Sequence, residues 1–300
     1  MDIARKGLRK IVKKIASYKL LPPKLTVFIL YSIETLRFPK LRNPKDLNEK
    51  LIWLAFNTDT TRWSRLTDKY EVRNFISEKG FANILTPLIG VFENADEIDF
   101  DNLPECFVIK STNGTAQTIV VDDKSIIDKE KIKKEIKSWQ TQNLGYSSGE
   151  IHYLRIPQRI IIEQKLGGKT TELPIDYKFM CINGKVHSCL VCSERDKKVF
   201  TSRRNLMEVN NWKEIADSVN KNYRGDPSTL KQPHNLKEMV KIAEVLSQEF
   251  PFVRVDLYEV EGKIYFGEMT FTPSGFHITS INRKTLKEMG NLLILPGSKS

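Results

Sequence analysis

The sequence predicts an α+β protein built from antiparallel strands and amphipathic helices. Residues 251–260 alternate apolar and polar side chains, which is the two-residue period of a strand with one buried face. Residues 235–250 place apolar side chains three and four positions apart, the spacing of a helix with one apolar side. Asn183-Gly184 lies between two apolar runs and is the strongest short signal for a β-hairpin. Because hairpins join antiparallel strands, we expect antiparallel sheets covered by helices.

Composition narrows the class of protein. A chain of 300 residues is long enough for two or three lobes that share a core. No run of about 18 apolar residues is present, so we expect no membrane-spanning helix. No apolar segment with a cleavage site follows the start, so we expect no secretory signal. The cysteines form no secreted disulfide pattern, and Cys189-x-x-Cys192 lacks a second cysteine pair for zinc, so we expect core thiols and a cytoplasmic location.

Positive charge is concentrated at the start of the chain. Residues 1–19 hold seven Lys or Arg residues and one acid, Asp2, so this segment carries +6 of the net charge of +11. The remaining residues are only mildly basic, which argues against a body that binds nucleic acid. Binding to nucleic acid would rest on charge alone, and we expect none.

The same segment has the pattern of an amphipathic helix. Leu8, Ile11, Val12 and Ile15 lie at helical spacing, and basic residues fill most other positions. Two interpretations stay open, a helix that contacts an anionic membrane surface and a helix that packs on its own body. The prolines at 22 and 23 are expected to end this helix before a second one at 24–37.

Two further helices are expected before the first strands. Residues 43–50 read as a loop that enters a helix with apolar positions up to Phe56. Residues 68–79 predict another helix, on which Lys69 and Arg73 are expected to be solvated charges rather than groups that face a substrate.

A strand that ends in a lysine opens the next unit. Residues 107–110 form an apolar run that ends at Lys110, residues 111–117 are a polar loop, and residues 118–121 form a second strand. A lysine and the backbone N–H groups of such a loop can bind phosphate. Gly114 is the only glycine of the loop, although backbone approaches phosphate most easily at glycine. A helix over 128–142 is expected to cover this pair.

Two more segments supply candidate site residues. Residues 159–168 read as an apolar strand that runs into a hinge. In the hairpin around Asn183-Gly184, a two-residue turn pairs Ile182 with Lys185, which places Lys178 opposite Cys189 and on one face with Met180 and His187. The flanking aromatic residues suggest that Lys178 points into a site, whereas His187 is expected to be a neighbour rather than a catalyst.

The last hairpin carries two acids, Asp256 and Glu268, twelve residues apart. With a three-residue loop containing Gly262, they lie opposite each other on one face of the sheet. A two-residue turn would put them on opposite faces, since one residue of slip flips every side chain. Opposite Cβ atoms lie about 5 Å apart, which suits two carboxylates that share Mg²⁺ ions about 4 Å apart. A pair of solvated acids is the alternative.

A basic stretch over 194–205 remains open to two interpretations. It is either a solvated loop or a grip for an anion, because Arg binds phosphate and carboxylate with two parallel hydrogen bonds. Arg195 and Arg204 are the candidates in this stretch.

Three stretches resemble one known family. The last hairpin reads Val-Arg-Val-Asp-Leu-Tyr at 253–258 and Gly-Lys-Ile-Tyr-Phe-Gly-Glu-Met-Thr-Phe-Thr-Pro at 262–273, and it looks like the closing hairpin of TupA-like ATP-grasp proteins. The family has a similar Asn-Pro-Lys…Asn-Glu-Lys entry, here at 43–50, and a similar Asp-Lys-Tyr-x-Val-Arg, here at 68–73. Such proteins are associated with bacterial surface-polysaccharide gene clusters and are often labelled glycosyltransferases.

The resemblance implies an ATP-grasp fold with nucleotide between its last two parts. The expected parts are basic amphipathic N-terminal helices at 1–40, a helical pre-ATP-grasp lobe at 41–105, a small lid at 106–168 and a larger C-terminal antiparallel sheet at 169–300.

The resemblance also implies roles for individual residues. Asp256, Glu268 and Thr270 would hold Mg²⁺, with Thr270 standing where many ATP-grasp enzymes place an asparagine. Arg254 would offset charge on the transferring phosphoryl group together with Lys178. Residues expected to bind ATP are Lys110, Asn113, Gly114, Thr115, Glu163 (at the adenine amino group), Gln164, Lys165, Leu166 and Lys178, and those expected at the reacting groups are Arg254, Lys178, Arg195 and Arg204.

The implied activity is that of an ATP-dependent carboxylate–amine ligase. It would amidate an acidic sugar of a capsule or O-antigen precursor with an amino acid or another amine. One alternative is a glycosyltransferase that uses a sugar nucleotide. That class often holds its metal with an Asp-x-Asp motif, and no such metal-binding motif is expected here. Another is an inactive nucleotide-binding relative, which the single loop glycine and Thr270 would favour.

Overall fold

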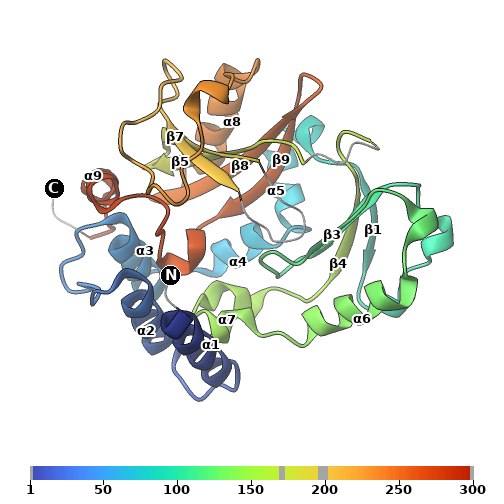
Figure 1. The fold of residues 1–300 in the computed structure, drawn as a ribbon, viewed down its shortest axis with the longest axis horizontal. Helices are drawn as coiled ribbons and strands as arrows, with labels where there is room; N and C mark the ends of the chain where they lie inside the picture. The colour runs from blue at the N-terminus through green and yellow to red at the C-terminus, as the bar shows by residue number, and fades with distance from the viewer. Residues whose placement is uncertain (1–2, 169–172, 195–201, 298–300) are drawn as a thin grey trace.

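The computed structural model describes residues 3–168, 173–194 and 202–297, which form two antiparallel sheets with helices around them (Figure 1). The predicted α+β class is confirmed. Within these ranges no helix has both the length and the apolar character needed to cross a membrane.

The larger sheet has the strand order β7-β6-β5-β8-β9. One face of its strands is apolar and packs under α8 (Leu236–Ser247), whose buried side includes Met239, Ile242 and Leu246. The opposite face carries polar and charged residues at alternate positions. The strands are β5 (Asp176–Ile182), β6 (Lys185–Ser193), β7 (Arg203–Met207), β8 (Phe252–Val260) and β9 (Lys263–Thr270).

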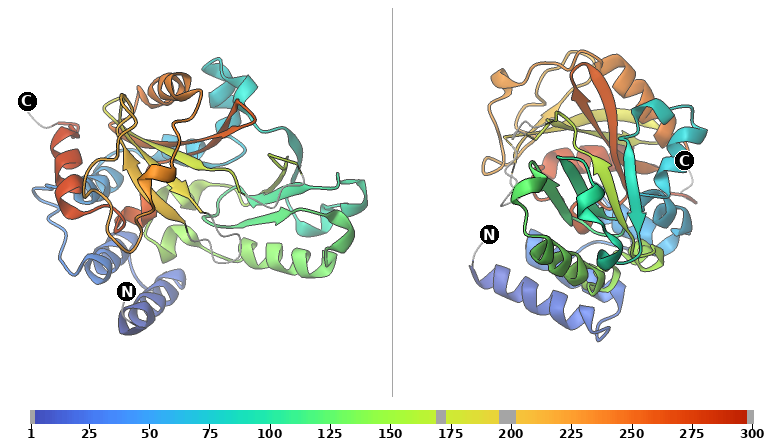
Figure 2. Two further views of the ribbon diagram at one scale, coloured as in Figure 1. Left: turned by 45° about the horizontal axis from the view of Figure 1, so that its top comes forward. Right: turned by 90° about the vertical axis from the view of Figure 1, so that its right-hand side faces the viewer.

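The smaller sheet has the order β1-β4-β2-β3 and its own core under α6 (Lys129–Gln140). Figure 2 shows this sheet and α6 projecting from the rest of the molecule, and we call these elements the lid. Asp128 begins α6 by accepting a hydrogen bond from the Lys131 backbone N–H at 2.9 Å, an ordinary helix cap. The strands are β1 (Leu88–Phe92), β2 (Phe107–Ser111), β3 (Thr118–Val121) and β4 (Ile160–Gln164).

The remaining helices surround the end of the larger sheet. The clearest helix start is that of α3, where Asp46 and Glu49 form a capping box. Residues of α2, α3, α4 and α5 share one core with the larger sheet, and α1 meets α2 in a second, small cluster around Val12 and Leu30. These helices are α1 (Ile3–Ser17), α2 (Pro23–Thr35), α3 (Leu47–Asn57), α4 (Thr61–Thr67), α5 (Val72–Glu78), α7 (Leu144–Ser147) and α9 (Arg283–Leu292), and short 3₁₀ turns include η3 (Phe100–Asn102), η5 (Ile151–Arg155) and η7 (Pro273–Phe276).

The β8–β9 hairpin combines the tighter of the two expected turns with a bulge. Glu261 and Gly262 form a two-residue turn, both with positive φ, and Val260 pairs with Lys263. That register alone would place the two acids on opposite faces. An extra residue in β9, Gly267, shifts the pairing by one, so that Asp256 lies directly opposite Glu268.

The β5–β6 hairpin has the same construction with a different result. Ile182 pairs with Lys185 across the Asn183-Gly184 turn, as predicted. An extra residue in β6, His187, then moves the register, so Lys178 lies opposite Leu190 and not opposite Cys189. The predicted pairing was wrong, and so was the shared face of Lys178 with His187, because a bulge cannot be read from turn length.

Candidate functional site

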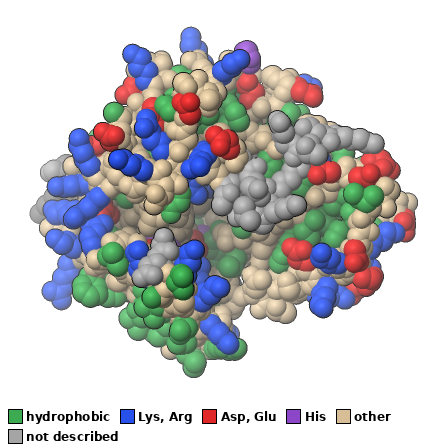
Figure 3. Space-filling view, viewed as in Figure 1, with side chains coloured by type: hydrophobic (Ala, Val, Ile, Leu, Met, Phe, Trp, Pro, Cys, Tyr) green, Lys and Arg blue, Asp and Glu red, His purple; other side chains and the backbone are tan. Residues whose placement is uncertain are grey.

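A cavity of about 830 Å³ lies between the larger sheet and the lid. Figure 3 shows it as a hollow near the centre of the molecule. Alternate residues of all five strands of the larger sheet form its floor, because side chains two positions apart share a face. These floor residues are Asp176, Lys178, Met180, Leu190, Cys192, Arg204, Arg254, Asp256, Tyr258 and Glu268.

Strand pairing aligns three charged residues across this floor. Lys178 of β5 lies opposite Asp256 of β8, which in turn lies opposite Glu268 of β9. Lys178 Nζ donates to the Asp256 carboxylate and forms an ion pair with Asp176 Oδ2 at 2.6 Å. The row is built from backbone register and therefore exists before any ligand binds.

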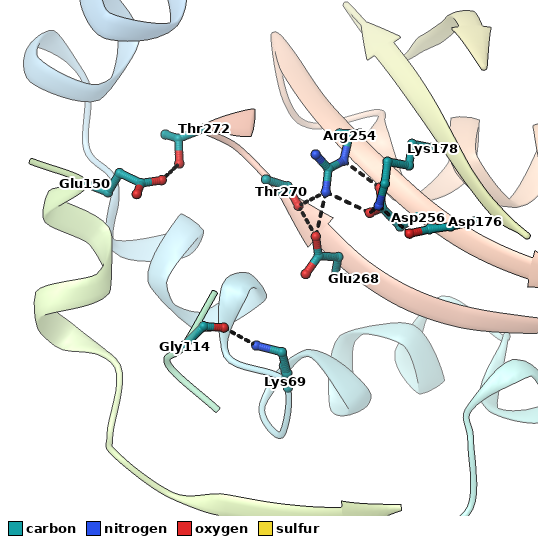
Figure 4. Close-up of polar contacts among 10 residues, drawn as sticks. All are labelled: Lys69, Gly114, Glu150, Asp176, Lys178, Arg254, Asp256, Glu268, Thr270 and Thr272. Atoms are coloured by element: carbon teal, nitrogen blue, oxygen red, sulfur yellow. Dashed lines mark hydrogen bonds and ion pairs between the residues drawn. The ribbon is translucent and has the colours of Figure 1, made fainter. Parts of the chain in front are cut away.

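Arg254 joins the two acids of the row (Figure 4). Its Nε donates to Asp256 Oδ1 at 2.6 Å, and its Nη2 donates to Asp256 Oδ2 at 2.7 Å and to Glu268 Oε1 at 2.6 Å. The hydroxyl of Thr270 donates to Glu268 Oε1 at 2.9 Å and accepts from Arg254 Nη2 at 3.0 Å. Charge-assisted hydrogen bonds of this kind hold both carboxylates in place.

The pKa values of the two carboxyl groups are shifted in opposite directions. Burial raises the pKa of Asp256 to about 6, although Arg254 and Lys178 oppose the rise. Burial alone would also raise the pKa of Glu268, but Arg254 and Lys178 lower it to about 2. Both groups are ionised at pH 7 and can therefore bind a cation.

The donor set fits Mg²⁺ that is shared with phosphate. The described residues contain no group of three or more acid, His or Cys side chains that could hold a metal by themselves. Mg²⁺ is commonly bound by one or two carboxylates together with substrate phosphates. Asp256 and the partly accessible Glu268, whose side chain is 40% exposed, provide two such carboxylates at the cavity wall.

The loop over 111–117 forms part of the roof. Lys69 Nζ donates to the Gly114 carbonyl at 2.7 Å, so the helical lobe holds the loop directly (Figure 4). Ala116 has a φ of 57°, a left-handed conformation that glycine adopts more easily. A Cβ at Gly114 would lie 1.8 Å from Gln117 Oε1, so a side chain there would force the Gln117 side chain to move.

Lys69 and Arg73 are not solvated helix charges, which corrects the prediction. Burial lowers the pKa of Lys69, which lines the cavity. Arg73 Nη1 donates to Glu163 Oε1 at 3.0 Å, and Lys110 Nζ donates to Glu163 Oε2 at 2.6 Å. Glu163 is buried and accepts from two cations. The helix predicted over 68–79 begins only at Val72, so Lys69 lies in the turn before it, and tertiary contacts hold both cations inward.

The expected hinge follows Glu163 directly. Gln164 is exposed, and its backbone N–H donates to the Pro87 carbonyl at 3.0 Å. Lys165 is buried and pairs with Asp122 at 3.3 Å and with the Gly168 carbonyl. The side chain of Lys165 therefore orders the hinge rather than facing the cavity.

The predicted site residues divide into two groups. The cavity wall includes Lys110, Gly114, Lys178, Arg204, Arg254, Asp256 and Glu268. The rest of the described set does not line this cavity, namely Asn113, Thr115, Glu163, Gln164, Lys165, Leu166 and Thr270. Arg195 lies outside the described residues.

Sequence reasoning missed several residues of the wall. Asp176 stands two positions before Lys178 in the same strand, so the two-residue period could have identified it. Lys131 and Glu135 reach the cavity from α6, and Ser274 reaches it from η7. No local signal marks these three residues, because their position depends on how the lid and η7 pack.

Arg204 has no carboxylate partner among the described residues, unlike Arg254. Its guanidinium lies over the ring of Tyr223 at 5.2 Å, and its Nε is buried without a hydrogen-bond partner there. It lines the cavity one strand beyond Cys192, which places this cation two strands from Lys178.

A family model described as TupA-like ATPgrasp matches residues 49–294. The chain has no significant match among curated proteins. Its likeness to solved structures is distant. A D-alanine–D-alanine ligase from Bacillus anthracis complexed with ATP is 14% identical, with 87% of this chain and 71% of that chain covered and a TM-score of 0.46.

Two other solved structures are similar at the same level. An L-amino acid ligase from Bacillus licheniformis is 16% identical over 75% of this chain and 46% of that chain, with a TM-score of 0.44. A D-alanine–D-alanine ligase from Helicobacter pylori is 16% identical over 85% and 68%, with a TM-score of 0.44. At these scores the family is carried by the match over 49–294 and not by the structural likeness.

Proposed function

The chain belongs to the TupA-like ATP-grasp family, and from that premise we propose that it is an ATP-dependent ligase that joins a carboxylate to an amine. The observation that carries the proposal is the row Lys178–Asp256–Glu268, which faces the lid lysine Lys110 across one cavity. Two carboxylates opposed to cations suit a bound nucleotide with Mg²⁺ between its phosphates and the protein.

The proposed nucleotide site uses both sheets. Lys110 and the Gly114 loop would meet the phosphates from the lid, and Lys178 would meet them from the floor. The backbone of the hinge at Gln164 and Leu166 would bind adenine, with Glu163 at the adenine amino group and Lys165 ordering the hinge. Asp256, Glu268 and Thr270 would hold Mg²⁺, which neutralises phosphate charge when bound.

The proposed reaction has two steps. A carboxylate oxygen of the acceptor attacks the γ-phosphorus of ATP, and the bond to ADP breaks, which leaves an acyl phosphate. An amine then attacks the acyl carbon, loses a proton and expels inorganic phosphate, which leaves an amide. Arg254 and Lys178 are positioned cations that stabilise the charge on the transferring phosphoryl group.

We further propose that the acceptor is an acidic sugar of a surface-polysaccharide precursor. Support comes from the association of the family with surface polysaccharides and from Arg204, a cavity cation without a carboxylate partner among the described residues. Arg195 is a second candidate for this acceptor. The four cysteines are free, which favours a reducing compartment such as the cytoplasm. The basic segment 1–19 would then lie at the inner surface of the membrane.

Thermal unfolding with Mg²⁺ and a non-hydrolysable ATP analogue tests the nucleotide site. At 100 times its dissociation constant the analogue should stabilise the wild type by about 2.7 kcal/mol. Glu268→Gln should lose most of this gain, as should omission of Mg²⁺. Absence of any shift in the folded wild type would refute the ATP site.

Release of ADP with uronic acids and amines then tests the ligase. If the nucleotide stabilises the protein but no pair of uronic acid and amine leads to ADP release, the result would favour an inactive nucleotide-binding relative. No observation in the described structure supports the alternative function, a glycosyltransferase that uses a sugar nucleotide. The chain does contain one Asp-x-Asp, at Asp99-Phe100-Asp101, which corrects the expectation of none. Asp99 caps η3 and Asp101 pairs with Lys129, and neither residue belongs to the cavity wall.

A further inference from the structure

Exposed apolar side chains gather on the N-terminal helices. Nine of the fourteen large apolar side chains exposed in the described part of the chain lie between residues 3 and 38. Figure 3 shows hydrophobic and basic side chains together at this edge of the molecule. We call this surface the α1 face, and it comprises Ile3, Leu8, Ile11, Ile15, Tyr18, Leu20, Leu25, Leu36 and Phe38.

The apolar stripe of α1 is divided between the body and solvent. Val12 and Ala16 are buried against α2 and α7. Leu8, Ile11 and Ile15 lie on the neighbouring side of the helix and are 50%, 57% and 38% exposed. Packing on the body therefore uses only part of the stripe, and nothing in the described chain covers the rest.

Polar contacts with the body help to set the orientation of α1. Arg9 Nε pairs with Glu34 of α2 at 3.0 Å. Burial lowers the pKa of Lys13, which also faces the body. Together with the burial of Val12 and Ala16, these contacts hold the exposed apolar side chains on the outer side of the helix.

Exposed lysines border the exposed apolar stripe. Lys6, Lys10 and Lys14 lie four positions apart and are all exposed, so they form one row along α1. The segment as a whole carries +6. An apolar stripe beside a cationic row matches the boundary of an anionic bilayer, where acyl chains lie directly below negatively charged headgroups.

We propose that the α1 face docks on an anionic lipid bilayer. Nucleic acid would engage the lysines but would leave the apolar stripe in water. A second copy of the chain would cover the apolar stripe but would bring two segments of charge +6 together. A bilayer containing anionic lipid satisfies both parts of the face.

Docking would also orient the cavity. Ser274 of η7 lines the cavity, and η7 packs against α2. The α1 face therefore adjoins the η7 end of the cavity, and an acceptor carried on a membrane lipid would approach from that end. This last step rests on the ligase function proposed above, whereas docking itself does not.

Vesicle flotation of the full chain tests docking. The protein should float with vesicles of phosphatidylcholine and phosphatidylglycerol and should not float with phosphatidylcholine alone. Ile11→Glu/Ile15→Glu should weaken binding at least tenfold, because both charges would enter the apolar layer. Lys6→Gln/Lys10→Gln/Lys14→Gln should weaken it about fivefold for each cation removed.

Ile126→Glu is the matched control, since Ile126 is 81% exposed but lies on the lid. It should float like the wild type. Docking is overturned if the wild type stays with the buffer, if Ile126→Glu loses flotation as fully as the α1 variant, or if the face proves to bury itself in a dimer by light scattering. Nucleotide-dependent stabilisation of the α1 variants should be unchanged, which separates this test from the ATP site.

Discussion

The two hairpins of the larger sheet are built alike and serve the site differently. Each has a two-residue turn with positive φ at both turn residues, and each has one bulged residue in its second strand. In β8–β9 the bulge at Gly267 brings Asp256 and Glu268 to one face. In β5–β6 the bulge at His187 leaves Lys178 opposite the apolar Leu190.

The difference lies in where each bulge falls relative to the charged row. Gly267 lies next to Glu268, inside the row, and a glycine is required because the strand backbone of Asp256 passes close by. His187 lies beyond the row, as the third residue after the turn, and it has a side chain that contacts Ser188. One bulge therefore assembles the site, and the other only adjusts the strand that supports it.

The largest expected effect follows from removing the centre of the row. Asp256→Ala leaves Arg254 and Lys178 in a buried position with one acid partner each, which should cost roughly 3–5 kcal/mol of unfolding free energy. Urea unfolding at pH 7 measures the loss. A cost below about 1 kcal/mol, the value of an exposed ion pair, would show that the row does not hold the sheet together.

Lys178→Met tests the cation that the register places in the site. Methionine keeps much of the side-chain volume but removes the charge, so binding of the ATP analogue should weaken by about 1.5–3 kcal/mol, or at least tenfold. Isothermal titration measures the affinity. Unchanged affinity would mean that Lys178 serves only to pair Asp176 and Asp256.

Gly267→Ala tests the bulge itself. The added Cβ would lie 2.9 Å from the Asp256 carbonyl and 3.0 Å from the Tyr258 ring, so we expect a loss of about 1–3 kcal/mol of stability. The Mg²⁺-dependent part of nucleotide binding should fall as well. The matched control is Gly7→Ala, in a helix with open space around it, which should be neutral or stabilising.

The smallest effect is expected at the other bulge. His187→Gln should leave nucleotide binding unchanged and alter stability at pH 7 by no more than about 0.5 kcal/mol. Burial lowers the pKa of His187 below its usual 6.5, so the folded state favours the neutral ring and loses stability as pH falls below that value. The variant should therefore be less sensitive to acid between pH 6.5 and 5, as followed by urea unfolding.

The lid shows what a local pattern can and cannot predict. The strands at 107–110 and 118–121 and the helix behind them were predicted from apolar spacing and are confirmed. The prediction that Lys69 and Arg73 are solvated was wrong. A helix surface pattern shows which residues are polar, but only docking of the lid turns those charges towards Gly114 and Glu163.

The sequence by itself indicated the α+β class and most of the strands, because periodicity and turn chemistry are local, and its motifs indicated the family. It did not predict β1 or β7. It also identified most charged residues of the cavity floor, since a two-residue period places them on one face. Tertiary structure alone decided the two bulges, the inward turn of Lys69 and the exposure of Ile11. Each of these depends on which surfaces meet, and that is set by packing between segments far apart in the chain.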